Sequence, residues 1–314
     1  MKSTVVITDW GFPSLDPEKL VLSSPDIELR SYQCKTEEEV ADVAAEADVV
    51  MVQWAPVRGK ALGAMRKCRG IVRYGIGLDN IDLKAAEAAG IQVRNVPDYC
   101  LNEVADHTVA LMLSLQRQVH VVAGLVKQGQ WKITPPLSLP PLRKCTLGLV
   151  GFGRIAQLVA ERSKPFGMKV LASDPFAPLE VFEAAVVAPV SLDELLRQAD
   201  LVSLHCPLNE TTHHLINASA LGSMKPHALL VNTSRGGLVD TDSLVKAIRE
   251  GAIAGAALDV LEQEPIPKDH PLLSLERVIV TSHVSWYSSE SITELQRKAA
   301  LLALDLLQTP NRTG

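Results

Sequence analysis

Short apolar runs alternate with alanine-rich stretches of helical character through almost the whole chain of 314 residues. The predicted strands cover residues 5–8, 27–32, 48–53, 70–75 and 92–96, and then 146–150, 169–173, 201–205, 228–232, 254–260 and 277–282. Such alternation is typical of βαβ units, whose strands pair in parallel. The sequence therefore predicts an α/β protein with two parallel, doubly wound sheets, the second with the six strands of a dinucleotide-binding fold.

A long apolar helix is predicted over residues 102–120, between the two series of strands. Apolar residues occupy more than one of its faces, so we expect a second domain or a partner chain to cover it, and it is the candidate contact of a homodimer. Another long helix is predicted over residues 289–307. We expect it to return to the first series, which gives an inserted domain of residues 101–287 within an outer domain of residues 1–100 and 288–314.

The composition argues against several classes of partner. Hydrophobic residues make up 47% of the chain, and the net charge is -5 with no basic block, which argues against nucleic acid and anionic membranes as main partners. No window approaches the roughly 18 uninterrupted apolar residues of a membrane span, and MKSTVVITDW at the start is typical of a strand rather than a signal peptide. The five cysteines show no paired spacing. We therefore predict a cytoplasmic protein with reduced thiols, and we assign no metal ligands.

The strand predicted at TLGLV runs directly into a glycine-rich turn, GFGRIA, over residues 151–156. In a βαβ unit Gly151 permits the tight turn, Gly153 lets a pyrophosphate approach the main chain, and Ala156 lets the helix pack closely on the sheet. The dipole of that helix favours phosphate at its N-terminus. Asp174, at the end of the next strand, can bind ribose hydroxyls and repel a 2′-phosphate. The pattern predicts NAD as the cofactor; a structural glycine turn and another adenosine ligand, such as S-adenosylmethionine, are the alternatives.

Three candidate catalytic residues, Arg235, Glu264 and His283, each follow a strand of the second series. They can converge, because ligands of open α/β sheets bind at the carboxyl ends of the strands. Each alone could be an ordinary loop residue. Together they suit the reduction of a 2-keto acid: His283 supplies the proton, Glu264 raises the pKa of His283 and orients its ring, and Arg235 binds carboxylate and carbonyl oxygens. Asp259 is predicted to hold the nicotinamide carboxamide.

Several independent motifs carry a resemblance to a known family: VRYGIGLDNID, GLVGFGRIA, NTSRGGLVD, ALDVLEQEP and TSH. Over residues 5–307 the chain resembles the D-isomer-specific 2-hydroxyacid dehydrogenases. The resemblance implies an NAD-binding Rossmann domain inserted into a flavodoxin-like substrate-binding domain, a small 2-keto or 2-hydroxy acid as substrate, and Arg235, Glu264 and His283 as the catalytic set. It also implies that the GIG turn at residues 75–77 binds the substrate carboxylate. Formate dehydrogenases resemble this pattern with glutamine in place of Glu264, so this glutamate argues against them.

Within that family, LHCPLNETTHHLIN and HVSWYSSES resemble the C-terminal-binding-protein-like branch, whose members bind NAD, dimerise and in animals act as transcriptional corepressors. An NAD(H)-sensing interaction protein with little turnover is therefore the alternative function. The predicted cofactor site comprises Gly151, Gly153, Arg154, Ile155, Asp174, Cys206, Pro207, Thr233, Ser234, Arg235, Asp259 and His283. The predicted substrate site comprises Arg73, Gly75, Ile76, Gly77, Arg235 and Trp286. Trp54, Tyr74, Tyr99 and Trp286 suggest an aromatic wall suited to a bulky or apolar substrate.

Overall fold

The computed structural model describes residues 2–131 and 137–308 of the chain. It contains two compact units, one of residues Met1–Cys100 with Ser288–Gly314 and one of residues Leu101–Tyr287. The predicted domains also include residues 132–136 and 309–314, which lie outside the described residues.

The first unit is built on a parallel sheet of five strands in the order β2-β1-β3-β4-β5. Its strands are β1 Ser3–Ile7, β2 Ile27–Ser31, β3 Val49–Val52, β4 Gly70–Arg73 and β5 Gln92–Asn95. Its helices are α1 Asp16–Val21, α2 Glu37–Ala44, α3 Gly59–Ala64, α4 Leu83–Ala88 and α12 Ser289–Gln308. This strand order is the flavodoxin-like one, in which helices cover both faces of the sheet.

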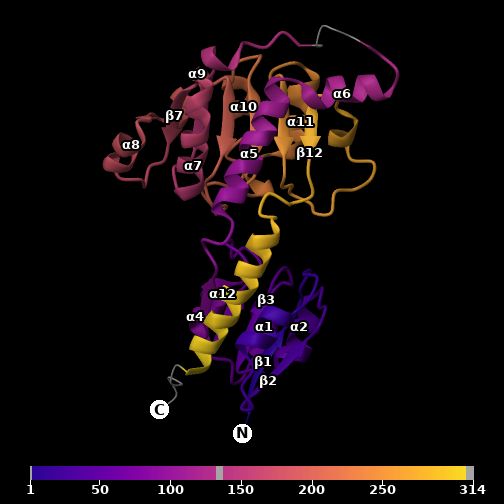
Figure 1. Ribbon diagram of the computed structural model, residues 1–314, viewed down its shortest axis with the longest axis vertical. Coiled ribbons are helices and arrows are strands. Elements are labelled where there is room, and N and C mark those ends of the chain that lie inside the picture. Colours follow the sequence, from indigo (N-terminus) through magenta and orange to yellow (C-terminus); the bar gives the residue numbers. More distant parts are fainter. Residues whose placement is uncertain (1, 132–136, 309–314) are drawn as a thin grey trace. The chain divides into compact units, whose positions relative to one another are not determined.

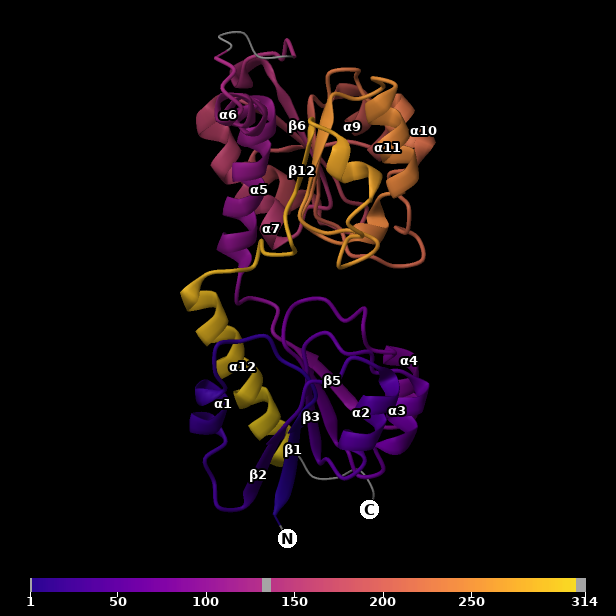
Figure 2. The same ribbon diagram turned by 90° about the vertical axis from the view of Figure 1, so that its right-hand side faces the viewer.

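Both faces of this sheet are apolar, and β1 shows why. Val5 and Ile7 belong to one core cluster and Val6 to another, because alternate residues of a strand point to opposite faces. Helices α1 and α12 cover the first face, and α2, α3 and α4 cover the second (Figure 2). The last helix of the chain belongs to this first unit, where it packs on α1, β3 and β4.

The second unit is built on a parallel sheet of seven strands in the order β12-β11-β10-β9-β6-β7-β8. Figure 1 labels β7 towards one side of this sheet and β12 towards the other. Its strands are β6 Thr146–Val150, β7 Lys169–Ser173, β8 Ala188–Pro189, β9 Leu201–Leu204, β10 Leu229–Asn232, β11 Gly255–Leu258 and β12 Val278–Val280. Its α-helices are α5 Leu101–Gln116, α6 Val119–Lys127, α7 Arg154–Ser163, α8 Leu179–Ala185, α9 Leu192–Gln198, α10 Ala218–Ser223 and α11 Thr241–Arg249. Short 3₁₀ turns are η1 Leu142–Lys144, η2 Lys164–Phe166, η3 Gly236–Leu238 and η4 Pro271–Ser274.

This order is that of a Rossmann sheet, with the direction of winding reversing between β6 and β9. Helices α5 and α7 cover one face and α9, α10 and α11 cover the other (Figure 2). In such sheets the ligand binds outside the carboxyl ends of the strands at the reversal. The predicted cofactor and catalytic residues of this unit follow β6, β7, β9, β10, β11 and β12, so they lie at this end of the sheet.

The prediction of six strands for this sheet was wrong by one. Strand β8 has only two residues and pairs with β7 at the edge, Leu171 opposite Ala188 and Ala172 opposite Pro189. Proline has no main-chain N–H group to donate to a neighbouring strand. It is therefore tolerated in an edge strand, which pairs on one side only. A segment this short lacks the run of four or more apolar residues by which strands are recognised in a sequence.

The single helix predicted over residues 102–120 is two helices. It breaks after α5 because Gln118 adopts a left-handed φ of 54°, and the Gln118 side chain bonds the main chain of Leu137 through both its amide nitrogen and its amide oxygen. Helix α5 buries residues such as Leu111 and Met112 in the core of its own unit, whereas α6 has no buried residue. No single helix of the described residues is long and apolar enough to cross a membrane, although α5 and α6, bent by 64° at their junction, together reach that length and composition.

Candidate active site

The glycine-rich turn lies at the carboxyl end of β6. Gly151 has a φ of +88°, and a Cβ atom there would lie 2.7 Å from the main-chain nitrogen of Cys206, so the turn requires glycine at this position. Gly153 is the N-cap of α7, and the space where its Cβ would point is open within 4 Å. The turn thus combines close packing on the loop after β9 with open main chain at a helix N-terminus, as a bound pyrophosphate requires.

Asp174 follows β7 and lies beside this turn. Its carboxylate accepts hydrogen bonds from the main-chain N–H groups of Phe152 (2.8 Å) and Phe176 (2.9 Å). These two bonds fix the orientation of the carboxylate and leave further lone pairs for a ligand. The residues of the turn therefore fit the pyrophosphate and ribose of NAD. Arg154 and Ile155 are the first two residues of α7, directly after this turn.

The other predicted cofactor residues lie on the neighbouring loops after β9 and β10. The Ser234 hydroxyl donates to the Cys206 carbonyl (2.8 Å), and the Pro207 carbonyl accepts from the Thr212 hydroxyl (2.6 Å). The Thr233 hydroxyl lies 2.8 Å from that of Thr108. Burial raises the pKa of the Cys206 thiol to about 11. A thiol with this pKa is protonated at neutral pH, so Cys206 is suited to packing and not to nucleophilic chemistry.

Glu264 and His283 form a pair. His283 Nδ1 lies 2.8 Å from Glu264 Oε2, and Glu264 Oε1 accepts a hydrogen bond from the Leu261 N–H group (2.8 Å). Burial alone would raise the pKa of Glu264, but the hydrogen bonds from His283 and Leu261 hold it below its usual value. The carboxylate is therefore charged at neutral pH, and it leaves Nε2 as the ring nitrogen of His283 that can exchange a proton with a substrate.

The main chain around His283 is held in an unusual conformation. His283 has a φ of 57°, which for a residue other than glycine costs about 1–3 kcal/mol and is found mainly at functional sites. Its N–H group donates to the Asp259 carbonyl (2.8 Å), and its carbonyl accepts from the Trp286 indole (2.8 Å). The Asp259 carboxylate accepts from the N–H groups of Val284 (3.0 Å) and Ser285 (2.9 Å). Asp259 and Trp286 therefore both position the histidine.

The side chain of Asp259 is fully buried. Burial opposes its ionisation, yet hydrogen bonds from the Thr281 hydroxyl (2.5 Å) and from the loop that follows hold its pKa below the usual value. His107 of α5 approaches the same group, with Nε2 3.3 Å from the Thr281 hydroxyl and 3.7 Å from Asp259 Oδ1. The predicted contact of Asp259 with the nicotinamide stays a prediction. The sequence reasoning missed His107 and Thr108, because α5 contains several other polar residues and nothing in the local pattern distinguishes these two.

Arg235 lies in the loop after β10 and is partly buried. Its Nη1 donates to the Ser234 carbonyl (2.6 Å), and its own carbonyl accepts from the Asn232 amide (2.8 Å). The next residue is in main-chain contact with the loop that carries Glu264, since a Cβ atom on Gly236 would lie 1.9 Å from the Leu261 carbonyl carbon. The loops after β10 and β11 are thus packed together, as their position at neighbouring strand ends predicts.

The predicted substrate residues of the first unit form their own compact arrangement at the end of β4. Gly75 has a φ of +138°, and a Cβ atom there would lie 1.5 Å from Arg73 Nη1, so the guanidinium occupies the space that any other residue at position 75 would need. The Ile76 carbonyl accepts from the Asn95 amide (2.6 Å) and the Gly75 carbonyl from the Val96 N–H group (3.1 Å). Asn95, which the sequence reasoning missed, therefore fixes the turn of residues 75–77.

The aromatic wall is not supported as it was predicted. Tyr74 is only 1% exposed, its ring packs edge-on against Phe12 with the centroids 5.2 Å apart, and its hydroxyl donates to Glu18 (2.9 Å). It is a core residue because the side chain before Gly75 points into the apolar layer between the sheet and α1. Trp54 is 55% exposed, and Trp286 is partly buried against Tyr287.

Comparison with known proteins identifies the chain. Residues 109–285 match the family model of the D-isomer specific 2-hydroxyacid dehydrogenase, NAD binding domain. A glyoxylate reductase of Korarchaeum cryptofilum is 42% identical over 248 residues, which cover 78% of this chain and 75% of that relative. A hydroxypyruvate reductase of Thermotoga maritima is 37% identical over 293 residues, 91% of this chain and 92% of that one.

A crystal structure of D-lactate dehydrogenase from Aquifex aeolicus, complexed with NAD and lactic acid, is similar with a TM-score of 0.89 and 28% identity over 97% of this chain and 95% of that one. The Rossmann sheet and these matches define an NAD-dependent oxidoreductase that interconverts a 2-keto acid and a 2-hydroxy acid. The chain belongs to the D-isomer-specific 2-hydroxyacid dehydrogenase family.

Proposed function

We propose that this chain reduces a small 2-keto acid to the D-2-hydroxy acid, with His283 as the acid and base, Glu264 as its charged partner and Arg235 as the substrate's cationic ligand. The observation that carries the proposal is the pair of His283 and Glu264, 2.8 Å apart, on a histidine whose main chain is held at a φ of 57°. Such a strained, hydrogen-bonded pair next to a Rossmann sheet serves to present one imidazole nitrogen in a fixed direction.

The chemistry of the side chains follows from this geometry. NADH, when bound, supplies the hydride. With Nδ1–H donating to Glu264, the protonated imidazole offers Nε2–H to the carbonyl oxygen of the substrate, and that proton completes the hydroxyl group. Arg235 offers a planar set of donors to the carboxylate and to the same oxygen. In the reverse direction, Nε2 accepts the hydroxyl proton, and the resulting imidazolium is stabilised by Glu264.

The substrate is proposed to be a small 2-keto acid such as glyoxylate or hydroxypyruvate, since the two relatives described above are named after these compounds. The buried position of Tyr74 weakens the case for a bulky substrate. Arg73 and the main-chain N–H groups of residues 75–77 are proposed to contact the substrate carboxylate, as the resemblance of the GIG turn suggests.

The test is the oxidation of NADH with glyoxylate, hydroxypyruvate, pyruvate and phenylpyruvate as acceptors. Arg235→Ala and His283→Ala are expected to abolish turnover while the quenching of tryptophan fluorescence by NADH is retained. Glu250→Gln, an exposed carboxylate at the end of α11, serves as the control and should keep full activity. Full turnover in either alanine variant would refute the catalytic assignment, and a preference for phenylpyruvate would refute the small substrate.

The C-terminal-binding-protein-like branch, with NAD(H) sensing as its function, remains a second proposal. It is supported by the HVSWYSSES motif, in which Trp286 bonds the His283 carbonyl. If the unmodified protein binds NADH but reduces none of the keto acids in the panel, sensing is favoured over catalysis.

We also propose a cytoplasmic homodimer that binds neither nucleic acid nor membranes. The dimer is supported by the exposed apolar surface of α6, where Val119 is 55% and Val126 43% exposed. The location is supported by the sequence spacing of the five cysteines, which forms no pairs. Light scattering during size-exclusion chromatography tests the dimer, and Val126→Glu should shift it towards the monomer.

A further inference from the structure

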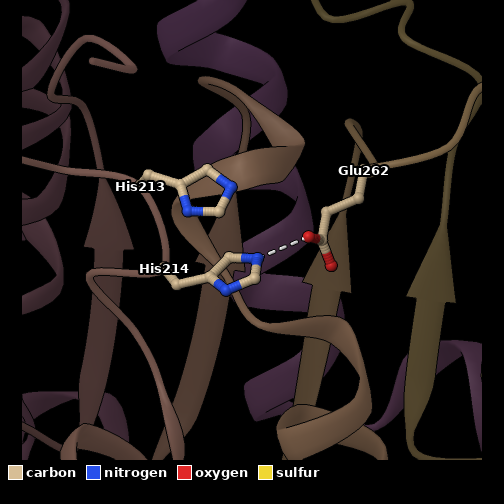
Figure 3. Close-up of side chains that lie close together, drawn as sticks. All are labelled: His213, His214 and Glu262. Carbon is tan, nitrogen blue, oxygen red and sulfur yellow. Dashed lines mark hydrogen bonds and ion pairs between the residues drawn. The ribbon is translucent and has the colours of Figure 1, made fainter. Parts of the chain in front are cut away.

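Two adjacent histidines and a glutamate of the second unit come together outside the proposed catalytic set. His213 and His214 lie in the loop after β9, and Glu262 lies in the loop after β11. His214 Nε2 is 2.6 Å from Glu262 Oε1, and the two imidazole rings stack with centroids 3.9 Å apart and planes at 25° (Figure 3). One potential ligand atom from each of the three side chains lies within 4.8 Å of the other two.

The main chain explains how neighbouring residues present their rings to the same side. Successive side chains of an extended segment point in opposite directions, but His214 adopts a left-handed φ of 52°. The His214 N–H group donates to the Gly237 carbonyl (2.8 Å), and the His213 N–H group donates to the Asn209 carbonyl (2.9 Å). A conformation of this kind costs about 1–3 kcal/mol in a residue other than glycine. The loop is therefore built to hold both imidazoles in one place.

A second hydrogen bond fixes the orientation of Glu262. Its Oε2 accepts a hydrogen bond from the Thr241 N–H group (2.9 Å) at the start of α11, which directs Oε1 towards the histidines. Hydrogen bonds of this kind on a ligating carboxylate are the usual means by which proteins orient metal ligands.

We propose that His213, His214 and Glu262 form a binding site for a divalent transition-metal ion, best matched by Zn²⁺. Two imidazoles and one carboxylate are typical of zinc, whereas Mg²⁺ and Ca²⁺ prefer oxygen ligands alone. Tetrahedral zinc with bonds of about 2.0–2.2 Å needs its ligand atoms roughly 3.3 Å apart. His213 is exposed and can close the remaining distance by rotating its side chain.

The surroundings favour a cation and leave room for it. A cavity of about 280 Å³ adjoins the cluster and is lined by His214 and Glu262 together with Asp240, Asp242 and His270. Three of these five side chains are acidic, which favours a cation in the cavity. The cavity can also hold the water that completes the coordination of a three-ligand zinc site.

The test is the binding of Zn²⁺ and Co²⁺ to the full-length chain after treatment with a chelator. We expect a single ion per chain, displaced from a fluorescent chelator, and a cobalt absorption spectrum with d–d bands of nitrogen and oxygen ligation. His213→Ala and Glu262→Gln should each weaken zinc binding by roughly tenfold or more. His227→Gln is the matched control, because His227 lies 2.8 Å from Asp200 in a histidine–carboxylate pair that lacks a second imidazole; this variant should bind zinc normally.

Unchanged zinc affinity in both His213→Ala and Glu262→Gln would overturn the proposal. So would an equal loss in the His227→Gln control, or a cobalt spectrum dominated by the charge-transfer band of a thiolate ligand. Circular dichroism of each variant establishes that it is folded before its affinity is compared. The readout is metal binding and not turnover, so this outcome is independent of the catalytic proposal.

Discussion

Replacing Glu264 by glutamine removes the negative charge beside His283 and keeps the shape of the side chain. The amide oxygen can still accept the hydrogen bond from Leu261, so the loop is expected to stay in place. A hydrogen bond to a charged group contributes about 1.5–3 kcal/mol. We take the lower value, because 35% of the His283 side chain and 38% of the Glu264 side chain are exposed and solvent weakens the interaction. A loss of about 1.5 kcal/mol corresponds to a roughly tenfold fall in kcat/KM.

The effect should depend on pH, and its direction follows from the charge of Glu264. Burial opposes the ionisation of this carboxyl, but the hydrogen bonds from His283 and Leu261 hold its pKa below the usual value, so it is charged at neutral pH and becomes neutral as the pH falls through that lowered pKa. Below that pH the parent has lost the same negative charge that the Glu264→Gln variant lacks. The loss of kcat/KM relative to the parent should therefore be full at neutral pH and should shrink in acid.

The assay is the initial rate of glyoxylate reduction by NADH between about pH 3.5 and pH 8, a range that begins below the usual glutamate pKa of about 4.3. Glu250→Gln is measured in parallel as a carboxylate-to-amide change at an exposed position. A Glu264→Gln profile that is lowered by the same factor at every pH would refute the reasoning, because general damage to the site has no pH dependence of its own.

Three further predictions concern residues that hold the site together. Arg235→Lys keeps the charge but loses the planar set of donors, so kcat/KM should fall roughly ten- to hundredfold while NADH affinity, measured by fluorescence, is unchanged; retained kcat/KM would contradict the assignment. Gly75→Ala should lower the free energy of unfolding in urea by about 1–3 kcal/mol, because its methyl group would displace Arg73, and an unchanged midpoint would show that the turn relaxes. Asp259→Asn should be about 1–3 kcal/mol less stable at neutral pH. The pKa of Asp259 is lowered in the folded protein, so the stabilisation from its charge is present above the unfolded pKa of about 3.9 and is lost as the pH falls through the folded pKa. The difference in unfolding free energy between the variant and the parent, measured with urea, should therefore shrink in acid. A difference that stays constant with pH would contradict this account.

The sequence predicted those parts of the site that depend on strand ends. Glu264 and His283 lie 19 residues apart in the sequence, yet both follow strands of one parallel sheet, so their convergence is a property of the topology. The strands themselves were recognised because β6 and β9 are mainly apolar segments of five and four residues. The glycine turn was predicted by the same logic, since its spacing matches what a pyrophosphate at a helix N-terminus requires.

The parts that were missed depend on conformation that no local pattern encodes. Strand β8 has only two residues. The break after α5 occurs at Gln118, whose main chain has a left-handed φ that the neighbouring residues do not predict. Tyr74 was expected to belong to an aromatic wall because its segment was expected to line the cleft, but the side chain of a residue at the end of a strand can point to either face of the sheet. Its burial is decided by contacts with Glu18 and Phe12, which lie more than 50 residues away in the sequence.

The loop after β11 carries two glutamates, and each pairs with a histidine from another loop. Glu262 pairs with His214 at 2.6 Å and Glu264 with His283 at 2.8 Å, and both histidines have a left-handed φ, of 52° and 57°. The pairs differ in what lies beside them. His283 is held by an indole and by main-chain groups, which leave one ring nitrogen to exchange a proton, whereas His214 is stacked on a second imidazole that adds another ligand atom. The same type of histidine–carboxylate pair thus suits proton transfer at His283 and metal binding at His214. The difference is the second imidazole, that of His213, which is present only beside the His214 pair.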